Sequence, residues 1–217
     1  MERGNSHIPV FFDIETTGLN PLAQAWHNKQ KYDAQVTAIG VGYFDDYDGD
    51  ERQRVIKVEY GPNEYKLLSD LRDRMHKIEA EISASGVEPI VVGFNSRQYD
   101  HPYLVARYSR LRQNPYPFCH EWKRLDMMRA LRKRDGKYWN QDDYARHIGV
   151  HTEDEFDGSD MPEAFDKRQW RKILDHVRAD MEDMMDIFTH DLSDFMNHFY
   201  DHYGIDKDMV VLDDEEL

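Results

Sequence analysis

The feature that most constrains the fold is a short apolar run, residues 8–12, that ends directly in acidic residues. Its length and its valine and phenylalanine content predict a buried β-strand. Asp13 and Glu15 stand two residues apart at the end of this strand, so their side chains point to one face. Neighbouring carboxylates repel each other unless they share a cation or a proton, and Mg²⁺ prefers such oxygen ligands. The pattern favours a metal site over the alternative, a solvated strand end.

The rest of the chain alternates between strand and helix patterns. We expect strands over 35–43, 54–60 and 89–94, a helix over 63–84 and a helix over 99–111. This order predicts one α/β domain, with the first three strands in a meander and the fourth parallel to the first after a helical crossover. We also expect loops over 22–33 and 45–50, and short helices over 123–134 and 141–148. A long helical stretch over 168–203 and an acidic solvated tail over 204–217 follow. Residues 1–217 are expected to form this single domain, with a core that spans about 8–203.

Composition excludes several classes of protein. The only cysteine, Cys119, rules out an internal disulfide and a cysteine-based zinc cluster. The longest uncharged apolar run has nine residues, 36–44, whereas a membrane span needs about 20. The N-terminal residues have no apolar segment typical of a secretory signal. We therefore expect a soluble, cytoplasmic protein without a membrane partner.

The charge is acidic overall but unevenly distributed. The 217 residues carry 43 acidic and 28 basic side chains, a net charge of −15. Residues 93–137, however, hold 11 basic and 4 acidic residues, so one surface could contact phosphates. Arg107 and Arg110, three apart on an expected helix, could face one groove; the alternative is a solvated basic face that pairs with the acidic C-terminal region. The acidic surplus fits either plain solubility or adaptation to a salt-rich cytoplasm.

Two later segments repeat the combination of a buried element and an acid. In GFNSRQYD a strand ends at Phe94, the chain turns, and Asp100 begins a helix. Taken alone, Asp100 is explained as a first-turn acid that favours the helix by about 0.3–1 kcal/mol. In HVRAD, His176 and Asp180 lie four residues apart and so share one helix face. Taken alone, these two form an ordinary surface pair.

Taken together, the three segments resemble the motifs of the DEDD (DnaQ-like) 3′–5′ exonuclease superfamily. DIETTG is similar to its Asp-x-Glu motif, GFNSRQYD to its second motif, and the His–Asp pair to its third, over about residues 8–190. The resemblance implies a ribonuclease H-like α/β fold with a mixed five-stranded sheet flanked by helices. The third motif departs from the pattern, because a histidine stands at the spacing of the subgroup that carries tyrosine.

The resemblance also implies a catalytic site. Asp13, Glu15, Asp100 and Asp180 would hold two divalent cations, Mg²⁺ or Mn²⁺, and His176 would be the general base or position the attacking water. Asp13 would bridge the two cations, and Asp100 would act mainly through water. A histidine suits proton transfer near neutral pH.

Substrate contacts follow from the same resemblance. Tyr99 could stack on a base, a contact worth about 1–3 kcal/mol, or could pack in the core. The residues implied to contact the nucleic acid are Thr16, Thr17 and Leu19 at the terminal nucleotide, with Leu19 as an apolar wedge, and Phe94, Asn95, Arg97 and Tyr99 around the second motif.

The sequence thus predicts a metal-dependent 3′–5′ exonuclease that acts on single-stranded nucleic acid, with DNA favoured. Three alternatives remain open: an exoribonuclease that trims RNA 3′ ends, a non-catalytic nucleic-acid-binding module on the same fold, and a proofreading or repair subunit that acts in trans with a polymerase. No residue selects between deoxyribose and ribose.

Overall fold

The computed structural model describes residues 7–18, 34–44, 54–84, 86, 88–115, 123–131, 137–153, 156, 158–192 and 210–211. The expected loops over 22–33 and 45–50, together with Leu19 and Cys119, lie outside the described residues. None of the described helices is long and apolar enough to cross a membrane.

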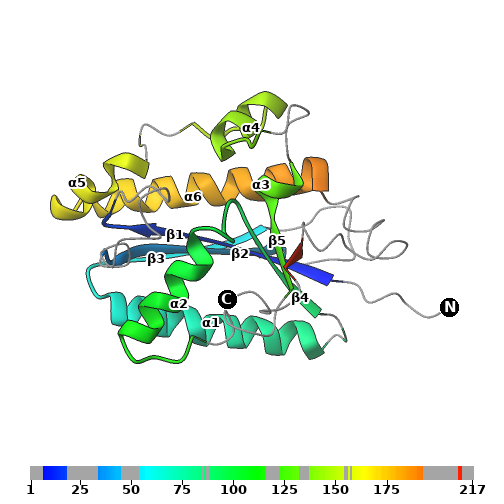
Figure 1. The fold of residues 1–217 in the computed structure, drawn as a ribbon. Coiled ribbons are helices and arrows are strands. Elements are labelled where there is room, and N and C mark those ends of the chain that lie inside the picture. The colour runs from blue at the N-terminus through cyan, green and yellow to red at the C-terminus, as the bar shows by residue number, and fades with distance from the viewer. Residues whose placement is uncertain are drawn as a thin grey trace.

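A mixed sheet forms the centre of the molecule (Figure 1). Strands β1, β2 and β3 form the predicted antiparallel meander, and β4 pairs parallel to β1 after the crossover through α1. The strand order is β3-β2-β1-β4-β5-β6. Bounds of the strands are His7–Thr16 (β1), Val36–Phe44 (β2), Arg54–Tyr60 (β3), Glu88–Gly93 (β4), Lys123–Asp126 (β5) and Val210–Val211 (β6). The mixed α/β sheet is confirmed, with β6 as a two-residue addition to the five expected strands.

Two expectations about the part of the sheet formed by β5 and β6 were wrong. Residues 123–126, predicted as helix, form β5, which pairs parallel to β4; only Met127–Ala130 form a short helix, α3. Four residues are too few to show a hydrophobic period, so the hydrogen bonds offered by β4 decide the structure here. In addition, β6 lies inside the segment predicted to be a solvated tail and pairs antiparallel to β5.

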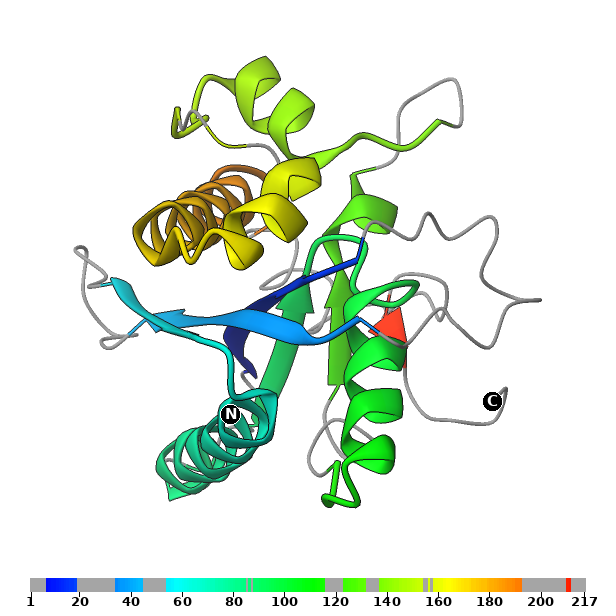
Figure 2. The same cartoon turned by 90° about the vertical axis from the view of Figure 1, so that its left-hand side faces the viewer.

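Helices cover both faces of the sheet (Figures 1 and 2). On one face lie α4 (Gln141–Ile148), α5 (Met161–Asp166), which the sequence did not predict, and α6 (Trp170–Ile187). On the other lie α1 (Glu64–Ala84) and α2 (Asp100–Arg110). The long helical stretch expected over 168–203 begins at Trp170, and a π-helical turn over Phe188–Leu192 follows α6.

The contact between α6 and the sheet explains two glycines of β2. A Cβ on Gly40 would lie 2.6 Å from Met181 Cγ, and one on Gly42 would lie 2.9 Å from Met181 Cε. Both distances are far below van der Waals contact, so a side chain at either position would push α6 away from the sheet. The glycines set how closely α6 approaches β1 and β2.

A buried ion pair joins the elements on the opposite face. Arg107 Nε donates to Glu64 Oε1 at 2.7 Å, and the same carboxylate oxygen accepts from the backbone N–H of Val36 at 2.8 Å. Both charged side chains are only 4% exposed. The pair therefore ties α1, α2 and the start of β2 together. The predicted role of Arg107 in a basic groove is wrong, because its guanidinium is buried against Glu64; Arg110 is exposed.

Replacing Arg107 with methionine should destabilise the protein strongly, because it leaves the Glu64 carboxylate buried without its partner. Such a loss costs about 3–5 kcal/mol, which corresponds to a fall in Tm of about 6–20 °C for a chain of this size. Thermal unfolding followed by circular dichroism measures it. The matched control, Arg110→Met at an exposed site, should change Tm by less than about 2 °C. An unchanged Tm for Arg107→Met, with weakened oligonucleotide binding, would restore Arg107 as a substrate contact.

Candidate active site

The site lies where the carboxyl ends of two parallel strands meet α6. Asp13 and Glu15 lie within β1, which continues to Thr16, so the strand extends further than the sequence predicted. Their alternation places both on the α6 face, because their β2 partners, Gly40 and Ala38, contact that helix or its core. Asp100 begins α2, which follows β4, the parallel neighbour of β1.

His176 and Asp180 reach the same site from α6. His176 Nε2 lies 3.3 Å from Glu15 Oε1 and 3.5 Å from Asp180 Oδ2. The three side chains offer ligand atoms that all lie within 4.8 Å of one another. His176 is buried, with its side chain 9% exposed, while the carboxylates remain partly open to solvent. The His–Asp pair is therefore not an ordinary surface pair.

The electrostatics show that the second motif belongs to the same cluster. Burial raises the pKa of Asp13 well above its ordinary value, and the negative charges of Glu15 and Asp180 raise it further. Burial likewise raises the pKa of Asp100, with further increases from the charges of Asp13 and Glu15. Asp100 is only 4% exposed, so it is not a solvated first-turn acid. The four carboxylates act on one another as a group.

These residues fit divalent cations. Asp13 Oδ2 is buried and accepts no hydrogen bond within the part of the chain that the structure describes. A buried carboxylate oxygen without a donor is costly, and a cation is the partner that removes both this cost and the mutual repulsion. The four acids offer only oxygen ligands, which suit Mg²⁺ or Mn²⁺.

Two side chains that the sequence did not single out support the α6 residues. Gln141 Nε2, at the start of α4, donates to the backbone carbonyl of Asp180 at 2.8 Å. The ring of Phe156 lies edge-on to the imidazole of His176, with 5.1 Å between centroids. Both come from segments without a recognisable motif, so no local signal identifies them.

Among the predicted substrate contacts, Thr16 of the first motif meets Tyr99 of the second, whereas Thr17 lies against the start of β2. Thr16 Oγ1 lies 3.0 Å from the Tyr99 hydroxyl, beside the acids, and Tyr99 stacks on Tyr103 with 5.6 Å between centroids. Burial raises the pKa of Tyr99 to about 12, so its hydroxyl stays protonated at neutral pH. Tyr99 thus packs in the core while its hydroxyl reaches the site. Thr17 Oγ1, in contrast, accepts from the backbone N–H of Gln35 at 2.9 Å and holds the chain entering β2.

The remaining predicted contacts lie on the loop before α2. Phe94 is partly buried and packs against the core on the α6 side, while Arg97 is exposed. Asn95 adopts a left-handed backbone with a φ of 59°, which asparagine tolerates better than most residues. Its backbone shape therefore explains this asparagine without a substrate contact.

Asp126 holds this loop and is a residue that the sequence reasoning missed. It accepts from the backbone N–H groups of Asn95 at 3.0 Å, Arg97 at 3.1 Å and Met128 at 3.2 Å. It is 2% exposed, and its charge also raises the pKa of Asp100. Asp126 at the end of β5 could be found only once 123–126 was recognised as a strand beside β4.

Asp126→Ala should lower stability and weaken the site together. It leaves buried N–H groups of the second-motif loop without an acceptor, at a total cost of about 2–4 kcal/mol, or about 4–16 °C in Tm. Because the loop positions Asp100, Mn²⁺ binding measured by titration calorimetry well below Tm should weaken too. Glu182→Ala, which removes a partly exposed acid that pairs with Arg178 on α6, serves as the control. Unchanged Mn²⁺ affinity in a folded Asp126→Ala protein would contradict this positioning role.

No curated protein sequence matches this chain. Among solved structures, the family B DNA polymerase from the archaeon Pyrobaculum calidifontis is similar over 84% of this chain and 24% of its own, with 16% identity and a TM-score of 0.59. E. coli Exonuclease I in complex with a dT13 oligonucleotide is similar over 78% of this chain and 41% of its own, with 13% identity and a TM-score of 0.45. The chain thus spans less than half the length of either protein.

The family comparison agrees with the fold. A family model described as the RNase H superfamily matches residues 10–199. This span contains all five candidate catalytic residues and every helix of the described structure. The chain belongs to the RNase H superfamily.

Proposed function

We propose that the protein is a metal-dependent 3′–5′ exonuclease that acts on single-stranded DNA. The observation that carries the proposal is the cluster of Asp13, Glu15, Asp100 and Asp180 at the carboxyl end of β1, where Asp13 Oδ2 is buried and accepts no hydrogen bond from the residues that the structure describes. Membership in the RNase H superfamily supports nuclease chemistry. The 3′–5′ direction rests on the three-motif resemblance.

Each residue has a defined part in the proposed hydrolysis. Asp13, Glu15, Asp100 and Asp180 would hold two divalent cations. When bound, these would supply positive charge that helps ionise the attacking water and stabilises charge on the scissile phosphate and the leaving 3′ oxygen. His176 Nε2, which lies within 3.5 Å of carboxylate oxygens of both Glu15 and Asp180, would accept a proton from the attacking water.

The reaction balances as an ordinary phosphodiester hydrolysis. Water adds to phosphorus, the bond from phosphorus to the 3′ oxygen of the preceding nucleotide breaks, and that oxygen takes up a proton from solvent. The products are a nucleoside 5′-monophosphate and a chain one nucleotide shorter. Without cations, four carboxylates would repel the phosphate, so the arrangement requires metal ions for substrate binding as well as for chemistry.

A 5′-labelled single-stranded oligonucleotide tests the activity and its direction. With Mg²⁺ or Mn²⁺, we expect a ladder that shortens from the 3′ end, at both low and molar salt, and no ladder in EDTA. Asp13→Ala should reduce the rate about 10³-fold or more, since the lost charge stabilisation amounts to several kcal/mol. Glu182→Gln, at a partly exposed position of α6 whose side chain pairs with Arg178, should retain full activity. DNA and RNA oligonucleotides compared in parallel identify the preferred sugar.

Binding of the oligonucleotide without any metal-dependent shortening of DNA or RNA would contradict the proposal. It would leave the protein as a nucleic-acid-binding module.

The raised pKa values predict how the metal-free protein responds to pH. Because the folded state holds protons on Asp13 and Asp100 more tightly than the unfolded state, these groups favour folding below their ordinary pKa of about 3.9. That stability is lost as pH rises through the raised values. Asp13→Asn removes one buried charge, so it should raise the metal-free Tm at pH 7.5 by a few degrees and flatten its dependence on pH.

The same variant should abolish the rise in Tm that Mn²⁺ gives the unaltered protein. Differential scanning calorimetry in EDTA and in Mn²⁺ measures both effects. A lower metal-free Tm for Asp13→Asn would show that the carboxylate stabilises the fold and would contradict the repulsion described above.

A further inference from the structure

An exposed tyrosine and a partly buried tryptophan form an aromatic pair at the same end of the molecule as the four acids. Tyr60 ends β3 and is 42% exposed. Its ring centroid lies 6.3 Å from that of Trp170, the first residue of α6, with an angle of 32° between the planes. Trp170 in turn packs edge-on against Phe165 of α5 at 5.5 Å. Trp170 is therefore held in place from behind, while Tyr60 stays open to solvent.

Two independent measures place this pair close to the site. Glu15 pairs with Ala38, and Ala38 pairs with Tyr60, so Glu15 and Tyr60 lie on one face of the sheet. Two strand spacings separate them by about 10 Å. Along α6, Trp170 precedes His176 by six residues, which is about 9 Å of helix.

Basic residues flank Trp170 in the chain. Residues 167–172 read KRQWRK, with four cations and no acid, whereas residues 150–217 as a whole hold 6 basic and 21 acidic residues. All four cations are exposed. Lys167 and Arg171 pair with acids one helical turn away, Glu163 and Asp175. Such exposed pairs contribute little, so these cations can turn to a phosphate at small cost.

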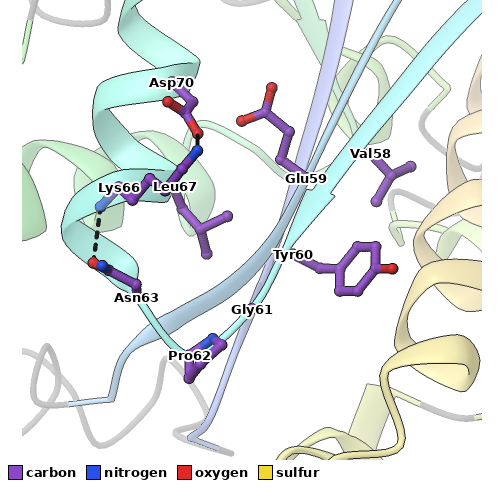
Figure 3. Close-up of a pocket in the computed structure, with 9 residues that line it drawn as sticks. All are labelled: Val58, Glu59, Tyr60, Gly61, Pro62, Asn63, Lys66, Leu67 and Asp70. Carbon is purple, nitrogen blue, oxygen red and sulfur yellow. Dashed lines mark hydrogen bonds and ion pairs between the residues drawn. The ribbon is translucent and has the colours of Figure 1, made fainter.

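The pocket on the other side of Tyr60 does not suit a phosphate. Figure 3 shows Tyr60 directed away from Lys66 and Asp70, toward the helices on the α6 side. The pocket, of about 480 Å³, contains two acids, Glu59 and Asp70, against one base, Lys66. A phosphate would therefore be repelled there.

We propose that Tyr60, Trp170 and the 167–172 segment bind the single-stranded substrate on the 5′ side of the scissile phosphate. The aromatic pair would stack on a base, and the cations would contact phosphates. Thr16, a predicted contact of the terminal nucleotide, meets the Tyr99 hydroxyl on the side of β4 and α2, whereas Tyr60 lies across β2 on the other side of β1. The acids thus lie between the two contacts, as a strand crossing the site requires. This inference rests on the proposed function.

Substrates of two lengths test it. Thymidine 5′-monophosphate p-nitrophenyl ester has a scissile phosphodiester but no nucleotide on its 5′ side, whereas (dT)12 has eleven. Tyr60→Ala should raise KM for (dT)12 about 5–150-fold, the effect of one lost stacking contact, and leave hydrolysis of the ester unchanged. Tyr60→Phe keeps the aromatic ring, so its KM for (dT)12 should equal that of the unaltered protein. The control is Tyr65→Ala, which removes a 58% exposed tyrosine from α1 and should change neither substrate.

The basic segment is tested by salt dependence. Arg171→Ala combined with Lys172→Ala should reduce the slope of log Kd against log salt for (dT)12 by about 1.4, as expected for two lost phosphate contacts on a single strand. Arg168 is left in place because its backbone is left-handed, with a φ of 54°. Arg178→Ala, an exposed cation further along α6, should leave the slope unchanged.

Fluorescence anisotropy of labelled (dT)12 in EDTA and in Mg²⁺ gives Kd independently of catalysis. If the unaltered protein binds (dT)12 but hydrolyses nothing, the proposed function fails while weaker binding by Tyr60→Ala still supports this surface. Equal losses on the ester and on (dT)12, or no loss on either, would overturn the inference and leave the exonuclease proposal standing. An unaltered protein that does not bind (dT)12 in either condition would overturn it as well.

Discussion

The rest of this structure depends on one constraint, the repulsion among four carboxylates that lie where the carboxyl ends of β1 and β4 meet α6. A solvated cluster of acids would cost little, but burial here raises the pKa of both Asp13 and Asp100, and each is raised further by its acidic neighbours. The fold therefore holds its least favourable electrostatic contact at the point where chemistry is proposed. Because bound cations would relieve this repulsion, the arrangement would account for the metal requirement that we propose for both binding and catalysis.

Holding those acids together takes rigid elements on every side. Gly40 and Gly42 let α6 approach the sheet closely enough for His176 to reach Glu15. On the other face, the buried pair of Glu64 and Arg107 fixes α2, which begins with the acid of the second motif. These four positioning residues are as buried as the apolar core, and two of them, Glu64 and Arg107, are charged.

Much of this arrangement was predictable from sequence. Local patterns predict β1, α1 and α6. They are the apolar run before Asp13, the spacing of four residues between His176 and Asp180, and the recurrence of apolar residues every three or four positions in α1, at Leu67, Leu71, Met75, Ile78 and Ile82. Short elements without a hydrophobic period could not be predicted in this way, because β5 is formed by pairing with β4, which is distant in the sequence. The roles that the sequence reasoning missed also depend on residues distant in the sequence. Asp126 and Arg107 act through groups 29–31 and 43 residues away, respectively, and Arg107, predicted to be an exposed groove residue, proved to be a buried partner.

Crystals soaked in Mn²⁺ and measured at a wavelength with strong anomalous scattering from manganese test the central claim most directly. We expect two anomalous peaks about 3.5–4 Å apart, both within ligand distance of Asp13 and with the other three acids around them. Asp13→Asn crystals treated in the same way should lose at least one peak. A fully soaked crystal with no manganese among these carboxylates would contradict the account, because their repulsion would then be relieved by protons alone.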